Sequence, residues 1–284
     1  MLSDDRPTAV ADRLARVGGV VGVALGGSRA RGVARPDSDV DLGLYYRGPL
    51  DVPGLRKLAA ELATDRDGGA TPELTEPGGW GRWVDGGGWL TIDGVPVDWL
   101  YRDLDRVAAA CAAARRGALD FGFQVGHPFG FAEVAYAGEL ALGRVLADPD
   151  GELGRLRAGL DPYPDALAAA FADRLDEARF LLGAVTKSAR RGDLVFVAGT
   201  LFRAVGLAAH AVAAAQHRWM ITEKGLVDEV GALPGTPAGF AGRARAVLSG
   251  LTDAPDVLGA AVEHAVALVA EADDFCRRRR SEQP

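Results

Sequence analysis

The spacing of hydrophobic and polar positions changes character once along the chain, close to residue 161. Before that point, short apolar runs with strand-like alternation are mixed with helical stretches and glycine-rich turns. After it, apolar residues recur at helical spacing in Ala- and Leu-rich segments. The pattern predicts an α+β protein, in which an N-terminal α/β domain with a small mixed sheet is followed by a C-terminal all-α helical bundle.

The first part of the chain is predicted to mix helices with strands and one hairpin. In chain order, we expect a helix over 7–17, a strand over 20–27, a short turn or helix over 28–34, a strand over 39–46, a helix over 53–63, a hairpin over 88–102 and a helix over 103–115. The hairpin rests on Asp93-Gly94, a strong two-residue turn signal between apolar runs. Residues 64–88 are rich in Gly, Asp, Pro and Trp and are predicted to form a long loop.

The second part of the chain is predicted to be helical throughout. One helical stripe covers 167–185, a second covers 194–208, and further helices are expected at 222–231, 238–250 and 254–278. We therefore divide the chain into a first domain over 1–115, a connecting segment over 116–160 and a helical bundle domain over 161–284. The pattern leaves the assignment of the connecting segment open.

Two aspartates interrupt the apolar run of the strand predicted over 39–46. Asp39 and Asp41 are two residues apart, so in a strand both point to the same face. Two ionised carboxylates in a half-buried place repel each other and lose hydration, which favours a bound cation between them. Mg²⁺ is the natural choice, because it takes one or two carboxylates together with substrate phosphates. The alternative is an ordinary edge strand with its polar residues facing water.

A glycine pair and a serine end the preceding strand. Gly26, Gly27 and Ser28 close one apolar run and open a turn or short helix. Glycine lets the backbone approach a phosphate closely, amides at a helix start point at anions, and a serine hydroxyl adds a donor. The segment therefore predicts a phosphate contact close to the two aspartates.

Together these residues form a motif. Gly26-Gly27-Ser28, ten intervening residues and Asp39-Val40-Asp41-Leu42 resemble the signature of the DNA polymerase β-like nucleotidyltransferase superfamily. The motif is most similar to the small-molecule branch, which includes the aminoglycoside and lincosamide nucleotidyltransferases. The resemblance implies a third carboxylate on a later strand, and Asp98, between Val97 and Trp99, is the candidate. Asp93 in the hairpin turn and Asp85 in a glycine-rich loop are weaker candidates.

The resemblance implies a reaction as well as a fold. It implies two Mg²⁺ ions held by Asp39, Asp41 and Asp98, and a nucleoside triphosphate, most often ATP, as co-substrate. A hydroxyl of a small-molecule acceptor, such as an antibiotic, would attack the α-phosphorus in line, take up AMP and release pyrophosphate. Asp98 would serve as a metal ligand or as a general base. The alternatives are a toxin-type enzyme that modifies protein or tRNA, and a nucleotide-binding protein without catalysis.

The resemblance also implies basic residues that contact the triphosphate. Arg31 follows the glycine turn, with a surface salt bridge as the alternative role. In relatives a basic residue of the helical domain reaches the triphosphate, and Lys187 and Lys224 are the candidates here. Each lysine has an ordinary alternative, because a cation near a helix C-terminus is favourable by itself.

Composition limits the classes of partner that the protein is expected to have. The formal net charge of the 284 residues is −7, which argues against a nucleic-acid partner, although a cationic acceptor would suit it. Two cysteines in different contexts, no signal peptide and no uninterrupted apolar run of membrane-spanning length lead us to expect a cytoplasmic protein without a membrane partner. The oligomeric state stays open.

Three tryptophans lie close together in the glycine-rich stretch before and within the hairpin. We interpret Trp80, Trp83 and Trp89 as hairpin core, because aromatic strand residues mostly serve packing. The alternative is a set of aromatic walls for the acceptor.

Overall fold

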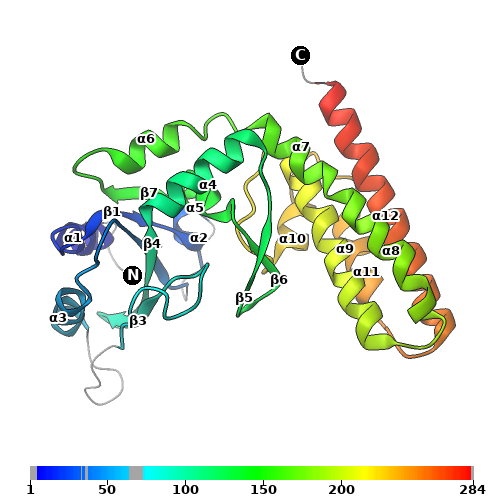
Figure 1. The fold of residues 1–284 in the computed structure, drawn as a ribbon, viewed down its shortest axis with the longest axis horizontal. Helices are drawn as coiled ribbons and strands as arrows, with labels where there is room; N and C mark the ends of the chain where they lie inside the picture. Colours follow the sequence, from blue (N-terminus) through cyan, green and yellow to red (C-terminus); the bar gives the residue numbers. More distant parts are fainter. Residues whose placement is uncertain (1–4, 33, 36–37, 64–72, 283–284) are drawn as a thin grey trace. The chain divides into compact units, whose positions relative to one another are not determined.

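The computed structural model describes residues 5–32, 34–35, 38–63 and 73–282 (Figure 1). The chain divides into two compact units, one formed by Met1–Ala113 and Asp120–Pro162 and the other by Ala114–Leu119 and Tyr163–Pro284. The first is a mixture of strands and helices, and the second is built from helices. The predicted α+β class is confirmed.

A five-stranded mixed sheet forms the centre of the first unit. Its strands, in sheet order, are β3 (Gly87–Ile92), β4 (Val95–Asp103), β2 (Val40–Tyr46), β1 (Val20–Leu25) and β7 (Arg144–Ala147). β2 and β4 are parallel, and every other neighbouring pair is antiparallel. The predicted hairpin is present, with Asp93 at its turn in the left-handed conformation.

One face of this sheet forms the core of the first unit with two helices. Leu14 of α1 (Asp5–Leu14) and Leu55 of α3 (Val52–Leu62) are fully buried against Leu42 and Trp99 of the sheet. The other helices of the first unit are α2 (Gly27–Ala30), α4 (Leu104–Arg116), α5 (Ala135–Leu142) and α6 (Glu152–Ala158). The last three residues of α4 belong to the second unit. A separate hairpin is formed by β5 (Phe121–Gln124) and β6 (His127–Ala132).

Several boundaries differ from the predicted ones. Most of the segment over 116–160 belongs to the first unit, where β7 pairs with β1 and completes one end of the sheet. Asp39 lies just before β2 rather than inside it, because the strand begins at Val40. Of the predicted loop over 64–88, residues 64–72 lie outside the described part, and Gly87 and Gly88 belong to β3.

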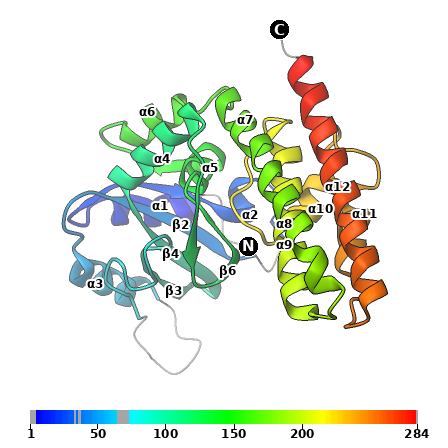
Figure 2. The same ribbon diagram turned by 45° about the vertical axis from the view of Figure 1, so that its right-hand side comes forward.

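Six helices make up most of the described second unit. They are α7 (Asp165–Asp173), α8 (Leu175–Ala189), α9 (Leu194–Ala214), α10 (Leu226–Gly231), α11 (Phe240–Leu248) and α12 (Pro255–Ser281). The stripe predicted over 167–185 is divided at Arg174 between α7 and α8. α9 begins where the side chain of Asp193 accepts a hydrogen bond from the amide of Phe196, an N-cap. α8, α9 and α12 pack side by side (Figure 1, Figure 2).

The central helix of the second unit is unusually apolar. α9 is long and apolar enough to cross a membrane by length and hydropathy, although Arg203 interrupts its apolar run. However, 67% of the most apolar window of α9 is buried within the protein, as in the core helix of a bundle. Its length and hydropathy are therefore weak evidence for a membrane span.

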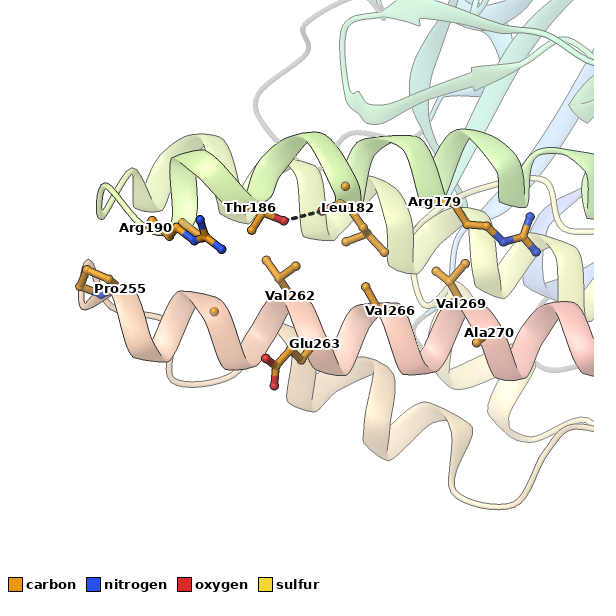
Figure 3. A pocket seen from close by; sticks show the side chains of 13 residues that line it. Arg179, Leu182, Thr186, Arg190, Pro255, Val262, Glu263, Val266, Val269 and Ala270 are labelled. Atoms are coloured by element: carbon orange, nitrogen blue, oxygen red, sulfur yellow. Dashed lines mark hydrogen bonds between the residues drawn. The ribbon is translucent and has the colours of Figure 1, made fainter.

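A groove runs between α8 and α12 (Figure 3). Its volume is about 600 Å³, and small and apolar side chains such as Leu182, Val262 and Val269 line it. Its charged lining residues are Arg179 on α8, Arg190 directly after α8 and Glu263 on α12. With one carboxylate in its lining, the groove lacks the cluster of oxygen ligands found in the first unit.

Candidate active site

Three carboxylates converge at one place in the first unit. One oxygen atom from each of Asp39, Asp41 and Asp98 can be chosen so that all three lie within 4.8 Å of one another. Asp41 on β2 stands directly beside Asp98 on β4 in the parallel register. Asp39 lies at the entrance to β2 and is exposed. The structure therefore brings together all three acidic residues that the sequence indicated.

Alternation along the strands explains why these carboxylates share a face. Val40 and Leu42, on either side of Asp41, are buried in the core between the sheet and the helices. Val97 and Trp99, on either side of Asp98, are buried in the same core. Because successive strand side chains point to opposite faces, burial of the apolar residues fixes the aspartates on the other face.

The cluster is electrostatically strained. Burial raises the pKa of Asp41 to about 6, with further increases from Asp39 and Glu139 that Arg102 and Arg31 partly oppose. Burial also raises the pKa of Asp98 to about 6, and the charges of Asp41 and Asp39 add to the effect. A hard divalent cation with oxygen ligands, such as Mg²⁺, fits this donor set and would relieve the repulsion.

The glycine turn packs directly against Asp41. The amide of Gly26 donates a hydrogen bond of 2.8 Å to the backbone carbonyl of Asp41. Gly27 has a φ of +61°, and a Cβ atom there would overlap the Asp41 carboxylate. Glycine is therefore needed at this position for two reasons, the left-handed backbone and the close approach. The predicted phosphate contacts of Gly26, Gly27 and the half-buried Ser28 stay predictions.

Two arginines, Arg29 and Arg31, follow this turn in the chain. The Nε atom of Arg29 donates to the carbonyl of Asp39 at 2.8 Å, and its Nη2 atom donates to the carbonyl of Ser38 at 2.5 Å. Arg29 thus connects α2 to the segment that carries Asp39, a positioning role that sequence reasoning missed. Arg31 is half-buried and lies at the end of α2, where its charge lowers the pKa of Asp41. Its predicted contact with phosphate stays a prediction.

A buried ion pair lies on the same face, further along the sheet. Arg102, only 5% exposed, donates to the two carboxylate oxygens of Glu139 at 2.6 and 2.9 Å. It also donates to the carbonyl of Tyr101 at 2.9 Å. The two charges act on Asp41 with opposite signs. The pair was not predicted, although an arginine four residues after Asp98 on one strand was the available signal.

The two weaker candidates for the third carboxylate serve other purposes. Asp85 is buried and accepts hydrogen bonds of 2.9 Å from the hydroxyl of Tyr46 and from the amide of Gly78, which fixes the loop before β3. Asp93 occupies the turn of the hairpin, as predicted, and forms an ion pair with Arg6.

The tryptophans divide into two environments. Trp83 is buried at 8% exposure, in agreement with the interpretation as core. Trp89, however, is 66% exposed, so that interpretation is wrong for it. Its strand position, opposite Asp98, puts the side chain on the acidic face and away from the core.

The two predicted lysines lie in the second unit. Lys187 is exposed in the last turn of α8, and Lys224 is exposed just before α10. Their contact with a triphosphate stays a prediction.

A mixed sheet that carries an acidic cluster of oxygen ligands beside a glycine turn is typical of a metal-dependent catalytic domain. Residues 8–100 match the family of nucleotidyltransferase domains, a stretch of about a third of the chain that contains all three aspartates. The match supports the polymerase β-like nucleotidyltransferase superfamily that the motif predicted. No curated protein is significantly similar to the chain. The family match and the carboxylate cluster together support metal-dependent nucleotidyl transfer.

Proposed function

We propose that this protein transfers AMP from ATP to a hydroxyl group of a small molecule, as in the small-molecule branch of the superfamily. The observation that carries the proposal is the convergence of Asp39, Asp41 and Asp98 within 4.8 Å inside the stretch that matches the nucleotidyltransferase family. We propose Mg²⁺ as the metal, ATP as the donor and the cytoplasm as the location.

The reaction balances without any further reactant. The acceptor oxygen forms a bond to the α-phosphorus as the bond from that phosphorus to the bridging oxygen of pyrophosphate breaks. The proton of the hydroxyl leaves to a base, and the products are the nucleotidylated acceptor and pyrophosphate. Because attack is in line, the acceptor and the leaving pyrophosphate lie on opposite sides of the phosphorus.

The chain's own residues divide this work. Asp39, Asp41 and Asp98 would hold two divalent cations, which when bound neutralise phosphate charge and make the attacking hydroxyl more acidic. Asp98 would act as a metal ligand or accept the hydroxyl proton as a general base. Gly26, Gly27 and Ser28 would hold phosphate oxygens, with Arg31, Lys187 or Lys224 as cationic partners.

The test is a transfer assay with the full chain. Each of the four nucleoside triphosphates, labelled on the α-phosphate, is incubated with MgCl₂ and a panel of hydroxyl acceptors that includes cationic aminoglycosides, a protein extract and tRNA. We expect the label of ATP to move to a small-molecule acceptor with release of pyrophosphate, and both to be lost in Asp41→Asn and Asp98→Asn. Asp12→Asn, on the exposed side of α1, is the matched control and should keep full activity.

Three results would contradict the proposal. Label on protein or tRNA would assign a different acceptor class. Binding of ATP without transfer to any acceptor would favour a nucleotide-binding protein. Failure of the chain to bind any nucleoside triphosphate in the presence of Mg²⁺ would refute the function altogether.

A further inference from the structure

An exposed tryptophan stands beside the third carboxylate. β3 and β4 pair so that Trp89 lies directly opposite Asp98. Directly opposed residues of an antiparallel pair point to the same face, with Cβ atoms about 4.5–5.5 Å apart. The next residue, Leu90, points into the core, which confirms that Trp89 faces the acidic side. At 66% exposure, Trp89 presents most of its side chain to solvent at this place.

A second tryptophan extends this surface. The rings of Trp80 and Trp89 stack, with their centroids 4.5 Å apart and their planes at 25°. Through this stack, the half-buried ring of Trp80 covers part of Trp89 and supports it from one side. We call these two residues the aromatic platform. It offers a flat apolar surface next to the carboxylates.

The loop that carries Trp80 is held in place by buried polar groups. The amide of Gln124 donates to the carbonyl of Trp80 at 2.7 Å, and the amide of Trp80 donates to the carbonyl of Asp85 at 2.9 Å. Gln124 and Asp85 are both buried. The platform is therefore organised before any ligand arrives, which lowers the entropic cost of binding to it.

The order of strands places the platform on the acceptor side of the reaction. The sheet runs from β3 through β4 and β2 to β1, and the glycine turn follows β1. With strands about 4.8 Å apart, Trp89 lies roughly 14 Å across the sheet from the turn predicted to hold the triphosphate. Asp41 and Asp98 lie between them. Since in-line attack puts the acceptor opposite the leaving pyrophosphate, the acceptor belongs on the side of Trp89.

We propose that the aromatic platform binds the acceptor, and that the acceptor is an alcohol whose hydroxyl is attached to or near a ring with a flat apolar face. The ring stacks on Trp89 while the hydroxyl reaches Asp98. The C–H face of a sugar and the face of an aromatic ring share the required chemistry. This inference deepens the proposed function and rests on it for the identity of the bound ring as acceptor.

Binding can be tested separately from transfer. Methyl glucoside, benzyl alcohol and glycerol serve as probes of a sugar face, an aromatic face and a hydroxyl without a ring. Each is titrated into the full chain by ligand-observed NMR, with MgCl₂ and a non-hydrolysable ATP analogue present. We expect one or both ring alcohols to bind more tightly than glycerol, and their relative affinities to identify the kind of ring.

The variants identify the platform. Trp89→Ala should weaken ring binding about tenfold or more, in line with the loss of one stacked ring. Trp89→Phe should keep most of it. Phe180→Ala, which removes an aromatic side chain of similar exposure on α8, should change nothing. Because Trp89 is mostly exposed and loses only its stack on Trp80, Trp89→Ala should stay folded with a small drop in melting temperature.

The outcomes separate this inference from the proposed function. Ring alcohols that bind no better than glycerol, or equally well to Trp89→Ala, would overturn the platform. Weaker binding of the ATP analogue to Trp89→Ala, with ring binding intact, would assign the platform to the nucleobase instead. If ring binding depends on Trp89 in the wild type and in Asp41→Asn while no acceptor is ever modified, the ring site stands and the proposed transfer fails.

Discussion

Replacing Asp41 with asparagine should stabilise the apoprotein at neutral pH while it abolishes transfer. In the folded chain the pKa of Asp41 is about 6, against an ordinary value of 3.8. The folded state therefore binds this proton more tightly than the unfolded state, so stability falls as the pH rises through about 4 to 6. The difference corresponds to about 3 kcal/mol at pH 7.5. Because the side chain is only partly buried, we expect about 1–3 kcal/mol.

The measurement is thermal unfolding in EDTA at pH 7.5 and at pH 4. The introduced asparagine is neutral at both pH values, so the variant should melt several degrees higher than the wild type at pH 7.5, at roughly 2–4 °C per kcal/mol. The gap should shrink strongly at pH 4, where Asp41 is protonated in the folded wild type. Asp12→Asn should give no comparable gap. Adding MgCl₂ should stabilise the wild type more than Asp41→Asn. Equal melting temperatures at pH 7.5, or a gap of the same size at both pH values, would refute the electrostatic argument.

Other predictions concern the surroundings of the carboxylates. Gly27→Ala should destabilise the protein by more than Gly32→Ala, since both glycines have positive φ but a Cβ at Gly32 meets nothing within 4 Å. Similar losses of unfolding free energy in the two variants would exclude a clash with the carboxylate. Lys187→Ala should weaken Mg²⁺–ATP analogue binding about ten- to a hundredfold in calorimetry with little loss of stability, and an unchanged dissociation constant would remove this lysine from the site. Arg102→Met should cost about 3–5 kcal/mol in urea unfolding because it leaves Glu139 unpaired, and Glu139→Gln added to it should recover part of that loss. No recovery would show that the loss is one of packing.

The elements that could be predicted are those whose signals are local. The Asp93-Gly94 turn specifies the hairpin with two residues, and the apolar neighbours of Asp41 and Asp98 assign their faces from alternation alone. Asp39 and Asp41 could be found from the strand period and the motif spacing, whereas Asp98 was found because the family resemblance implied a third carboxylate on a later strand. That they stand side by side depends on the parallel pairing of β2 and β4, which is not a local property.

The features that were missed depend on contacts between distant parts of the chain. β7 has four residues and only partial burial, so its pattern is weak, and its pairing with β1 defines it. The ion pair of Arg102 and Glu139 joins a strand to a helix 37 residues later. Trp89 was misassigned because an aromatic residue in a strand has the same sequence signal whether its face is covered or open.

The acidic face shows how one strand serves stability and chemistry at once. The side chains of β2 that point into the core, such as Leu42 and Leu44, are fully buried and stabilise the sheet. That stability allows the opposite side to hold Asp41 in a place where its charged form is unfavourable. A bound cation would relieve the strain on Asp41 and Asp98 without a change of fold, so the free energy stored in the apoprotein would become affinity for metal. Removal of one carboxylate should therefore make the protein more stable and less active. Such an opposition between stability and activity is expected where like charges are held together, half-buried, for function.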